Sequence, residues 1–433
     1  MNPRLWSLLT ASILLSLQSA SADSGDLSPA QPRIADHSFN LAAFGAVGDG
    51  KTSNTKIFAA AIGAVKKAGG GTLVVPAGAF LTGPIELCSG INLHLDPGAR
   101  IEFSDKVADY ASSDLRHHAQ IAVNALHDVM ISGAGTIDGH GEAWWDAARA
   151  RRDPVTGRQF NGTTSRPPML VCTHSQRLRV EGVTLVNSAG LNFGLTECED
   201  ATIEGITIHN PPDSPNTDGI DPKGAQRVLI SHCRIDTGDD CIAAGGSRTM
   251  VERDILITDC TFLHGHGCSI GSGTAGGVFN MTVRRCTFDG TETGVRLKSA
   301  RGRGGLVENV IYEDLTMVNV GRAVSINSHY EGTTTDNAGI EHVAAAPVTE
   351  QTPRWRHIVV RNLTAKAGTV DAGLILGLPE MPVEDIVLEH VTIEAPKGLQ
   401  IGYAYRVALR DVVINAKEGP PIIIADTVTA VTR

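Results

Sequence analysis

A short strand pattern returns along this chain at nearly constant intervals, and this repeat restricts the chain to few architectures. From residue 177 onward, nine segments alternate apolar and polar residues, from RLRVEGVTL to RVALRDVVI. Their seventh residues are spaced by 23, 27, 27, 26, 29, 48, 28 and 21 positions; they are Val183, Ile206, Cys233, Cys260, Cys286, Leu315, Leu363, Val391 and Val412. The long step contains the loop-like stretch 331–353, and residues 128–137 carry an earlier copy of the pattern. Such alternation predicts half-buried strands, and their regular return predicts a repeat fold.

The length of the interval selects among repeat folds. About 25 residues per unit is too short for a strand–helix–strand crossover, and propeller blades need roughly 40–50 residues. Stacked coils of strands and turns fit, so the sequence predicts a parallel β-helix. One helix is predicted at 53–67, before Gly69-Gly70-Gly71, where it caps the first coil. No linker or low-complexity run divides residues 23–433, so we expect a single domain.

The first residues have the pattern of an export signal. Arg4 precedes the apolar run LWSLLTASILLSL at 5–17, and Ala20-Ser21-Ala22 supplies small residues for cleavage. The apolar run is shorter than the roughly 20 residues needed to span a bilayer. We therefore expect residues 1–22 to be a cleaved signal peptide and the mature protein to be secreted or periplasmic, without a membrane partner.

Charge and cysteine content narrow the choice of partners. The chain has 37 Lys+Arg against 47 Asp+Glu, a net charge of −10, which disfavours nucleic acid as a partner. An anionic ligand would need a local basic cluster. The eight cysteines leave disulfides open, but Cys233, Cys260 and Cys286 follow the repeat interval. This spacing favours cysteine as a small buried filler. We expect a monomer.

Alignment of successive coils brings polar residues together. Matched positions in neighbouring coils lie about 4.8 Å apart. The second strand of five units reads DGIDPK, DCIAAG, GCSIGS, GVRLKS and AVSINS, starting at 218, 240, 267, 294 and 323. This alignment predicts two inward columns, Cys241 with Cys268 and Val295, and Ala243 with Ile270 and Leu297. The outward positions then form one polar stripe, made of Asp218, Asp239, Asp240, His266, Arg296 and Lys298.

Three carboxyl groups on one stripe suit hydrolysis of a glycosidic bond. One must be protonated to donate to the leaving oxygen, and another must be ionised to activate water. A calcium site is the alternative, but a metal cage is disfavoured by the basic neighbours His266, Arg296 and Lys298. We therefore expect neither a metal nor a cofactor. Arg296 and Lys298 project together and could grip a carboxylate, which points to an acidic sugar such as a uronate.

These residues resemble the polygalacturonases of glycoside hydrolase family 28. The resemblance rests on four ordered motifs and on the segment FNLAAFGAVGDGKTSNT at 39–55; the motifs are Asn216-Thr217-Asp218, Gly238-Asp239-Asp240, Gly265-His266-Gly267 and Arg296-Leu297-Lys298. Leu297 is a mild departure, because the family usually has Ile there. The resemblance implies a right-handed parallel β-helix that hydrolyses α-1,4 bonds between galacturonate units of pectin with inversion.

The resemblance also implies roles for individual residues. Asp239 would be the general acid, whereas Asp218 and Asp240 would hold and activate water. His266 would tune the proton of the acid. The remaining residues would bind substrate: Arg296 and Lys298 through its carboxylate, assisted by Asn216 and by Tyr330 of VSINSHYEG. An inverting enzyme needs its acid and base carboxyls about 6.5–9.5 Å apart.

Several rival functions remain open on the sequence. A rhamnogalacturonan or other pectin side-chain hydrolase could use the same scaffold, and so could a calcium-dependent pectate lyase. A non-catalytic β-helix that binds polysaccharide would need none of the three aspartates. Endo or exo action depends on loops at the ends of the groove, for which 100–120, 140–168 and 331–353 are the candidates.

Overall fold

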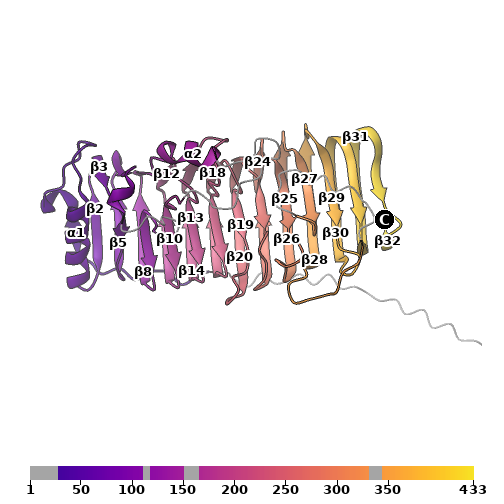
Figure 1. Ribbon diagram of the computed structural model, residues 1–433, viewed down its shortest axis with the longest axis horizontal. Helices are drawn as coiled ribbons and strands as arrows, with labels where there is room; N and C mark the ends of the chain where they lie inside the picture. The colour runs from indigo at the N-terminus through magenta and orange to yellow at the C-terminus, as the bar shows by residue number, and fades with distance from the viewer. Residues whose placement is uncertain (1–27, 111–117, 151–164, 331–343) are drawn as a thin grey trace, which may run out of the picture.

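The computed structural model describes residues 28–110, 118–150, 165–330 and 344–433, which form an elongated stack of β-coils (Figure 1). The 32 strands of these ranges belong to one hydrogen-bonded sheet whose successive coils pair in parallel. The predicted parallel β-helix is therefore confirmed. The expected signal peptide, 1–22, lies outside the described residues, as do parts of the three candidate loops. Within the described ranges, no helix has the length and apolarity needed to cross a membrane.

Three ladders of strands run along the stack. The first starts with β1 (Ser38–Asn40) and continues through β2 (Gly71–Val75), β5 (Ile91–Leu95), β8 (His127–Gly133), β11 (Gln176–Glu181), β14 (Glu199–Glu204), β17 (Gln226–Ser231), β20 (Glu252–Thr258), β23 (Val278–Arg284), β26 (Leu306–Val318), β28 (Arg354–Lys366), β30 (Val383–Gly402), β31 (Ala404–Ile424) and β32 (Thr429–Thr432). The second joins the end of β26 and contains β3 (Gly78–Thr82), β6 (Ala99–Phe103), β9 (Thr136–Asp138), β12 (Thr184–Val186), β15 (Thr207–His209), β18 (Arg234–Thr237), β21 (Thr261–His264) and β24 (Thr287–Asp289).

The third ladder is the one that carries the site. It joins the end of β30 and contains β4 (Ile85–Glu86), β7 (Ile121–Asn124), β10 (Leu170–Thr173), β13 (Phe193–Thr196), β16 (Ile220–Lys223), β19 (Ile242–Ala244), β22 (Cys268–Ile270), β25 (Thr293–Lys298), β27 (Arg322–Asn327) and β29 (Asp371–Leu376). Two short 3-10 turns, Leu41–Phe44 and Val107–Asp109, complete the N-terminal third.

A helix covers the N-terminal end of the stack, as predicted. Helix α1 (Thr55–Lys67) lies beside β2 at the indigo end of Figure 1. Its buried face joins the core through Phe58, Ala61, Ile62 and Val65. A second helix, α2 (Glu142–Arg149), was not predicted. It lies in a stretch interpreted as loop, and its buried Trp145 donates from Nε1 to the carbonyl of Ser188 at 3.0 Å.

The interior of the stack consists of columns of apolar residues, which include aliphatic, aromatic and cysteine side chains. The marker positions of the repeat stack as predicted, since Leu315 pairs with Leu363 and Val391 pairs with Val412. All eight cysteines are buried with free thiols, as the filler interpretation expected. Because each coil buries its inward side chains against its neighbours, the whole stack shares one continuous apolar core.

One predicted register is wrong by a single residue. Cys268 pairs with Ile242 rather than with Cys241, and Ile270 pairs with Ala244 rather than with Ala243. The cause is the turn between β18 and β19, where the four residues 238–241 match only the three residues 265–267 of the next coil. The pairings of Cys268 with Val295 and of Ile270 with Leu297 are as predicted. Ala243 consequently lies in the outward column and lines a cleft.

Candidate active site

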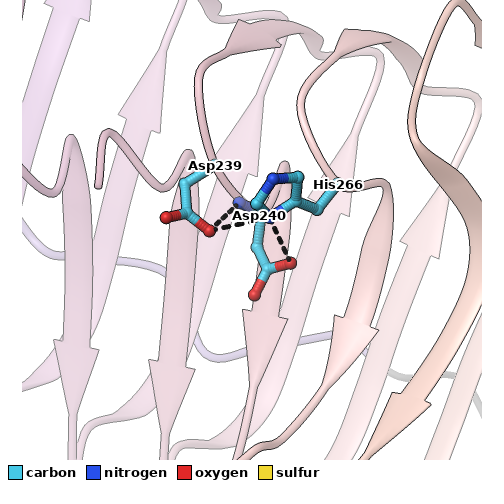
Figure 2. Close-up of side chains that lie close together, drawn as sticks. All are labelled: Asp239, Asp240 and His266. Atoms are coloured by element: carbon cyan, nitrogen blue, oxygen red, sulfur yellow. Dashed lines mark hydrogen bonds and ion pairs between the residues drawn. The ribbon is translucent and has the colours of Figure 1, made fainter. Parts of the chain in front are cut away.

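The predicted stripe forms where four strands of the third ladder lie side by side. Asp218 lies two residues before β16, and Asp239 and Asp240 lie in the longer turn before β19. His266 lies in the turn before β22. Figure 2 shows the two aspartates and the histidine side by side. Because Ile220 pairs with Ile242, Asp218 and Asp240 occupy matched positions in neighbouring coils.

Glycines allow the turns to approach each other this closely. Gly267 has φ +82°, and a Cβ atom there would lie 1.9 Å from the carbonyl oxygen of Thr293 in the next coil. Gly265 has φ +61°, and its Cβ would lie 2.3 Å from the carbonyl oxygen of Asp239 in the preceding coil. Glycine at both positions therefore lets the turn that carries His266 pack directly against the backbones of the preceding and the following coil.

Asp240 is the centre of a buried charge cluster. Its Oδ1 accepts hydrogen bonds from Arg296 Nη1 at 2.8 Å and Ser269 Oγ at 2.7 Å, and its Oδ2 accepts from Lys298 Nζ at 2.6 Å. The three charged residues are between 2% and 5% exposed. Burial raises the pKa of Asp240, but Lys298 and Arg296 outweigh burial and lower it overall. Asp240 is thus held ionised. Ser269 was missed by the sequence analysis, although it is in register with Arg296.

Asp239 accepts three hydrogen bonds. Its Oδ1 accepts from the backbone N–H of Asp240 at 2.9 Å and lies 3.0 Å from Nδ1 of His266, while Asn216 Nδ2 donates to Oδ2 at 3.2 Å. Asn216 is in turn held by Arg166, whose Nη2 donates to its Oδ1 at 3.1 Å. Burial raises the pKa of Asp239, but the bond with His266 and the nearby positive charges bring it well below its usual value.

The pKa of Asp218 is shifted in the opposite direction. Burial, followed by the charges of Asp239, Asp221 and Asp240, raises the pKa of Asp218 well above its usual value. The surroundings therefore favour the ionised form of Asp239 and Asp240 and the protonated form of Asp218. Asp239, which the resemblance makes the general acid, must therefore gain a proton before it can donate one.

The stripe opens into a cleft of about 670 Å³ that continues toward the ends of the same strands. Asp221 lies in it nearly buried, and Lys223 Nζ contacts Asp221 Oδ2 at 2.8 Å. Arg248 and Arg303 also line the cleft and are exposed. These residues were missed by the sequence analysis. The alternation in DGIDPK places Asp221 and Lys223 two residues apart, which was the available signal, but Arg248 and Arg303 come from loops.

The predicted substrate-binding residues lie together. The ring of Tyr330 is 5.6 Å from the guanidinium carbon of Arg296 and 5.2 Å from Lys298 Nζ. Lys298, Tyr330 and Asn216 line the cleft together with the three aspartates. The site therefore combines acidic groups with several cations, which suits a substrate that is itself negatively charged.

A metal ion fits this arrangement poorly. Asp239, Asp240 and His266 could each offer a ligand atom, and these atoms lie within 4.8 Å of one another. Asp240 is already neutralised by two buried cations, however, and His266 Nδ1 faces Asp239. An added divalent cation would be repelled by Arg296 and Lys298. Arg296 and Lys298 thus neutralise Asp240 in place of a metal ion, which disfavours metal binding by the three residues.

Comparison with known proteins places this geometry among carbohydrate-active enzymes. The model of the glycosyl hydrolases family 28 matches residues 66–406. A polygalacturonase of Chamaecyparis obtusa is 31% identical over 369 residues, covering 83% of this chain and 68% of that protein. An endo-polygalacturonase of Pectobacterium carotovorum subsp. carotovorum is 29% identical over 306 residues, covering 66% and 71%.

Solved structures agree with the fold. The hyperthermoactive exopolygalacturonase of Thermotoga maritima superposes with a TM-score of 0.77 at 29% identity, covering 90% of this chain and 94% of that one. The surface adhesin PfbA of Streptococcus pneumoniae also superposes, with a TM-score of 0.56 at 13% identity, covering 92% and 93%. The second likeness concerns the fold alone.

Proposed function

This chain belongs to glycosyl hydrolase family 28, and we propose that it hydrolyses the α-1,4 bonds between galacturonate units of pectin or polygalacturonate. The observation that carries the proposal is the cluster in which Asp218, Asp239 and Asp240 share one face with the buried Arg296–Lys298 pair. A surface with only a structural role would gain nothing from three crowded carboxyl groups, two of them held ionised by neighbouring cations.

The chemistry follows from the three carboxyl environments. Asp239, once protonated, donates its proton to the glycosidic oxygen as the bond to the leaving sugar breaks. A water molecule attacks the anomeric carbon from the opposite face and loses a proton to a carboxylate, which inverts the configuration. Asp240 has the ionisation state of that base. Asp218, in the matched position one coil away, orients the same water.

Substrate charge is recognised locally. The chain has a net charge of −10, so long-range attraction of a polyanion is not available to it. The cations that line the cleft, Lys298, Lys223, Arg248 and Arg303, supply the attraction instead, and Tyr330 adds an aromatic face. Lys298 and Lys223 already pair with Asp240 and Asp221, so the exposed Arg248 and Arg303 are the cations most accessible to a uronate carboxylate.

Activity on polygalacturonate tests the proposal. We expect wild-type protein to release reducing ends in excess chelator and Asp239→Asn to lose about 10²–10⁴-fold in kcat while still binding polymer. Proton NMR of fresh product should show the inverted anomer. Full hydrolytic activity of the Asn variant would refute Asp239 as the general acid. Wild-type protein that binds polymer without releasing reducing ends would favour a polysaccharide-binding protein, and unsaturated product that disappears with chelator would favour a lyase.

Product sizing separates the remaining alternatives. A rapid fall in polymer length indicates endo cleavage, and steady release of monomer or dimer indicates exo cleavage. Cleavage of rhamnogalacturonan but not of polygalacturonate would move the assignment to a related pectin hydrolase.

We further propose that the protein is exported, cleaved after Ala22 and active as a monomer. The support for export is the charged, apolar and small-residue order of residues 1–22. N-terminal sequencing of protein from the periplasm and medium should begin at Asp23, and sedimentation should give the mass of one chain.

A further inference from the structure

His266 contacts a carboxylate at each of its ring nitrogens. Nδ1 lies 3.0 Å from Oδ1 of Asp239, and Nε2 lies 3.0 Å from Oε2 of Glu292. Figure 2 shows the Asp239 side of the ring. Glu292 lies directly before β25 and was not singled out in the sequence.

The backbone fixes Glu292 in this position. Its N–H donates to the carbonyl of Gly265 at 2.8 Å, and its carbonyl accepts from the N–H of Arg322 at 3.0 Å. Glu292 is thus anchored between the coil of His266 and the following coil. Its side chain reaches the imidazole from the side opposite to Asp239 while remaining 38% exposed.

The two contacts determine how many protons the group holds. At 3.0 Å each nitrogen–oxygen contact is a hydrogen bond only if a proton lies between the two atoms. Ionised carboxylates supply no proton, and a neutral imidazole supplies one. For both contacts to be hydrogen bonds, Asp239, His266 and Glu292 must share two protons, one on Nε2 facing Glu292 and one between Nδ1 and Asp239.

We propose that Glu292 is a positioning residue that keeps a proton on Nε2 of His266 and so holds the second, transferable proton at the contact between His266 and Asp239. This inference rests on the proposed function, because it explains how Asp239 obtains the proton of a general acid. When that proton passes from Nδ1 to Asp239, His266 becomes the neutral Nε2–H tautomer, still bonded to Glu292. When Asp239 then gives the proton to the leaving oxygen, the site is one proton short until solvent resupplies it.

The other charged groups around the imidazole ring have opposite effects on the pKa of His266. Oδ1 of Asp240 lies 3.8 Å from Nδ1, and the positive charge of Arg296 acts against protonation. Lys298 contacts Asp240 and also stabilises Asp239 as a carboxylate. Burial lowers the pKa of His266, but the bond to Asp239 and the charges of Asp239 and Asp240 raise it overall. Glu292 adds a negative charge on the side of the ring opposite to Asp239.

The direct test is the titration of His266 in the mature protein without substrate. ¹⁵N-histidine NMR, with the signal assigned by its loss in His266→Asn, should show that Glu292→Gln lowers the pKa of His266 by roughly 0.5–1 unit. Glu292→Asp should restore part of the shift. The matched control is Asp289→Asn, because Asp289 is an exposed acid in β24 of the same coil. It should leave the titration unchanged.

The kinetic test uses the pH profile. We expect the alkaline limb of kcat for Glu292→Gln on polygalacturonate to move to lower pH by the same amount, with KM little changed and thermal stability like that of Asp289→Asn. An unmoved His266 titration, or a limb that moves equally in the control, would overturn the role of Glu292. If wild-type protein is inactive on polygalacturonate while the NMR shift is present, the proposed function fails and the proton-holding contact stands.

Discussion

Replacing Lys298 with methionine would remove one charge from a cluster that solvent scarcely reaches. Nζ of Lys298 lies 2.6 Å from Oδ2 of Asp240, and the two side chains are 6% and 4% exposed. Methionine keeps most of the apolar stem, so packing changes little. The variant therefore isolates the contribution of a buried positive charge.

The structure sets the expected size of the effect. Removing one partner of a buried ion pair costs about 3–5 kcal/mol when the other charge is left unpaired. Asp240 still has Arg296 at 2.8 Å and Ser269 at 2.7 Å, so we expect the free energy of unfolding at pH 7 to fall by about 2 kcal/mol.

The effect should depend on pH. Burial raises the pKa of Asp240, and Lys298 makes the largest contribution to lowering it again. A lowered folded-state pKa gives stability that is present above the unfolded value of about 3.9 and is lost as the pH falls through the folded value. Without Lys298 the pKa of Asp240 rises, so its carboxyl group can become protonated at mildly acidic pH. The neutral carboxyl then no longer needs the missing positive charge. The deficit of the variant should therefore shrink near pH 4.

Guanidinium unfolding at pH 7 and near pH 4 measures both quantities. The control is Arg285→Met, because Arg285 pairs with Asp259 at 2.7 Å on the surface, with 48% and 28% exposure. An exposed pair contributes at most about 1 kcal/mol. A loss for Lys298→Met no larger than for the control, or equal losses at both pH values, would refute the reasoning.

Three further outcomes follow from the site. Asp218→Asn should abolish activity yet raise the free energy of unfolding at pH 7 by roughly 1–2 kcal/mol. The reason is that the pKa of Asp218 is raised in the folded state, so the wild-type protein loses stability as the pH rises above the unfolded pKa. Unfolding experiments at pH 4 and pH 7 check that the gain grows with pH. Gly267→Ala should lower both melting temperature and kcat, because its Cβ would lie 1.9 Å from the carbonyl oxygen of Thr293; wild-type melting would contradict this. Lys223→Met and Arg303→Ala should each raise KM for polygalacturonate several-fold at low salt and less at high salt; a change confined to kcat would argue against charge recognition.

The sequence determined the period of the coils and the face on which the predicted site residues lie. The interval between markers and the alternation within each unit depend only on local spacing, which the fold preserved from Val183 to Val412. A separate local signal, the segment 53–67 followed by Gly69-Gly70-Gly71, predicted the helix found at Thr55–Lys67. The prediction that Asp218 and Asp240 lie in matched positions needed nothing more than this register.

The tertiary structure decided which outward groups touch. One additional residue in the turn before β19 shifted the register, so Ala243 faces outward and the expected column with Ile270 was wrong. The contacts of His266 with Glu292 and of Asp240 with Ser269 link different coils. Such contacts depend on the length and path of every intervening turn, and these are set by packing between coils. Local periodicity therefore determined which face of the solenoid carries the site, whereas packing between coils determined which side chains on that face are in contact.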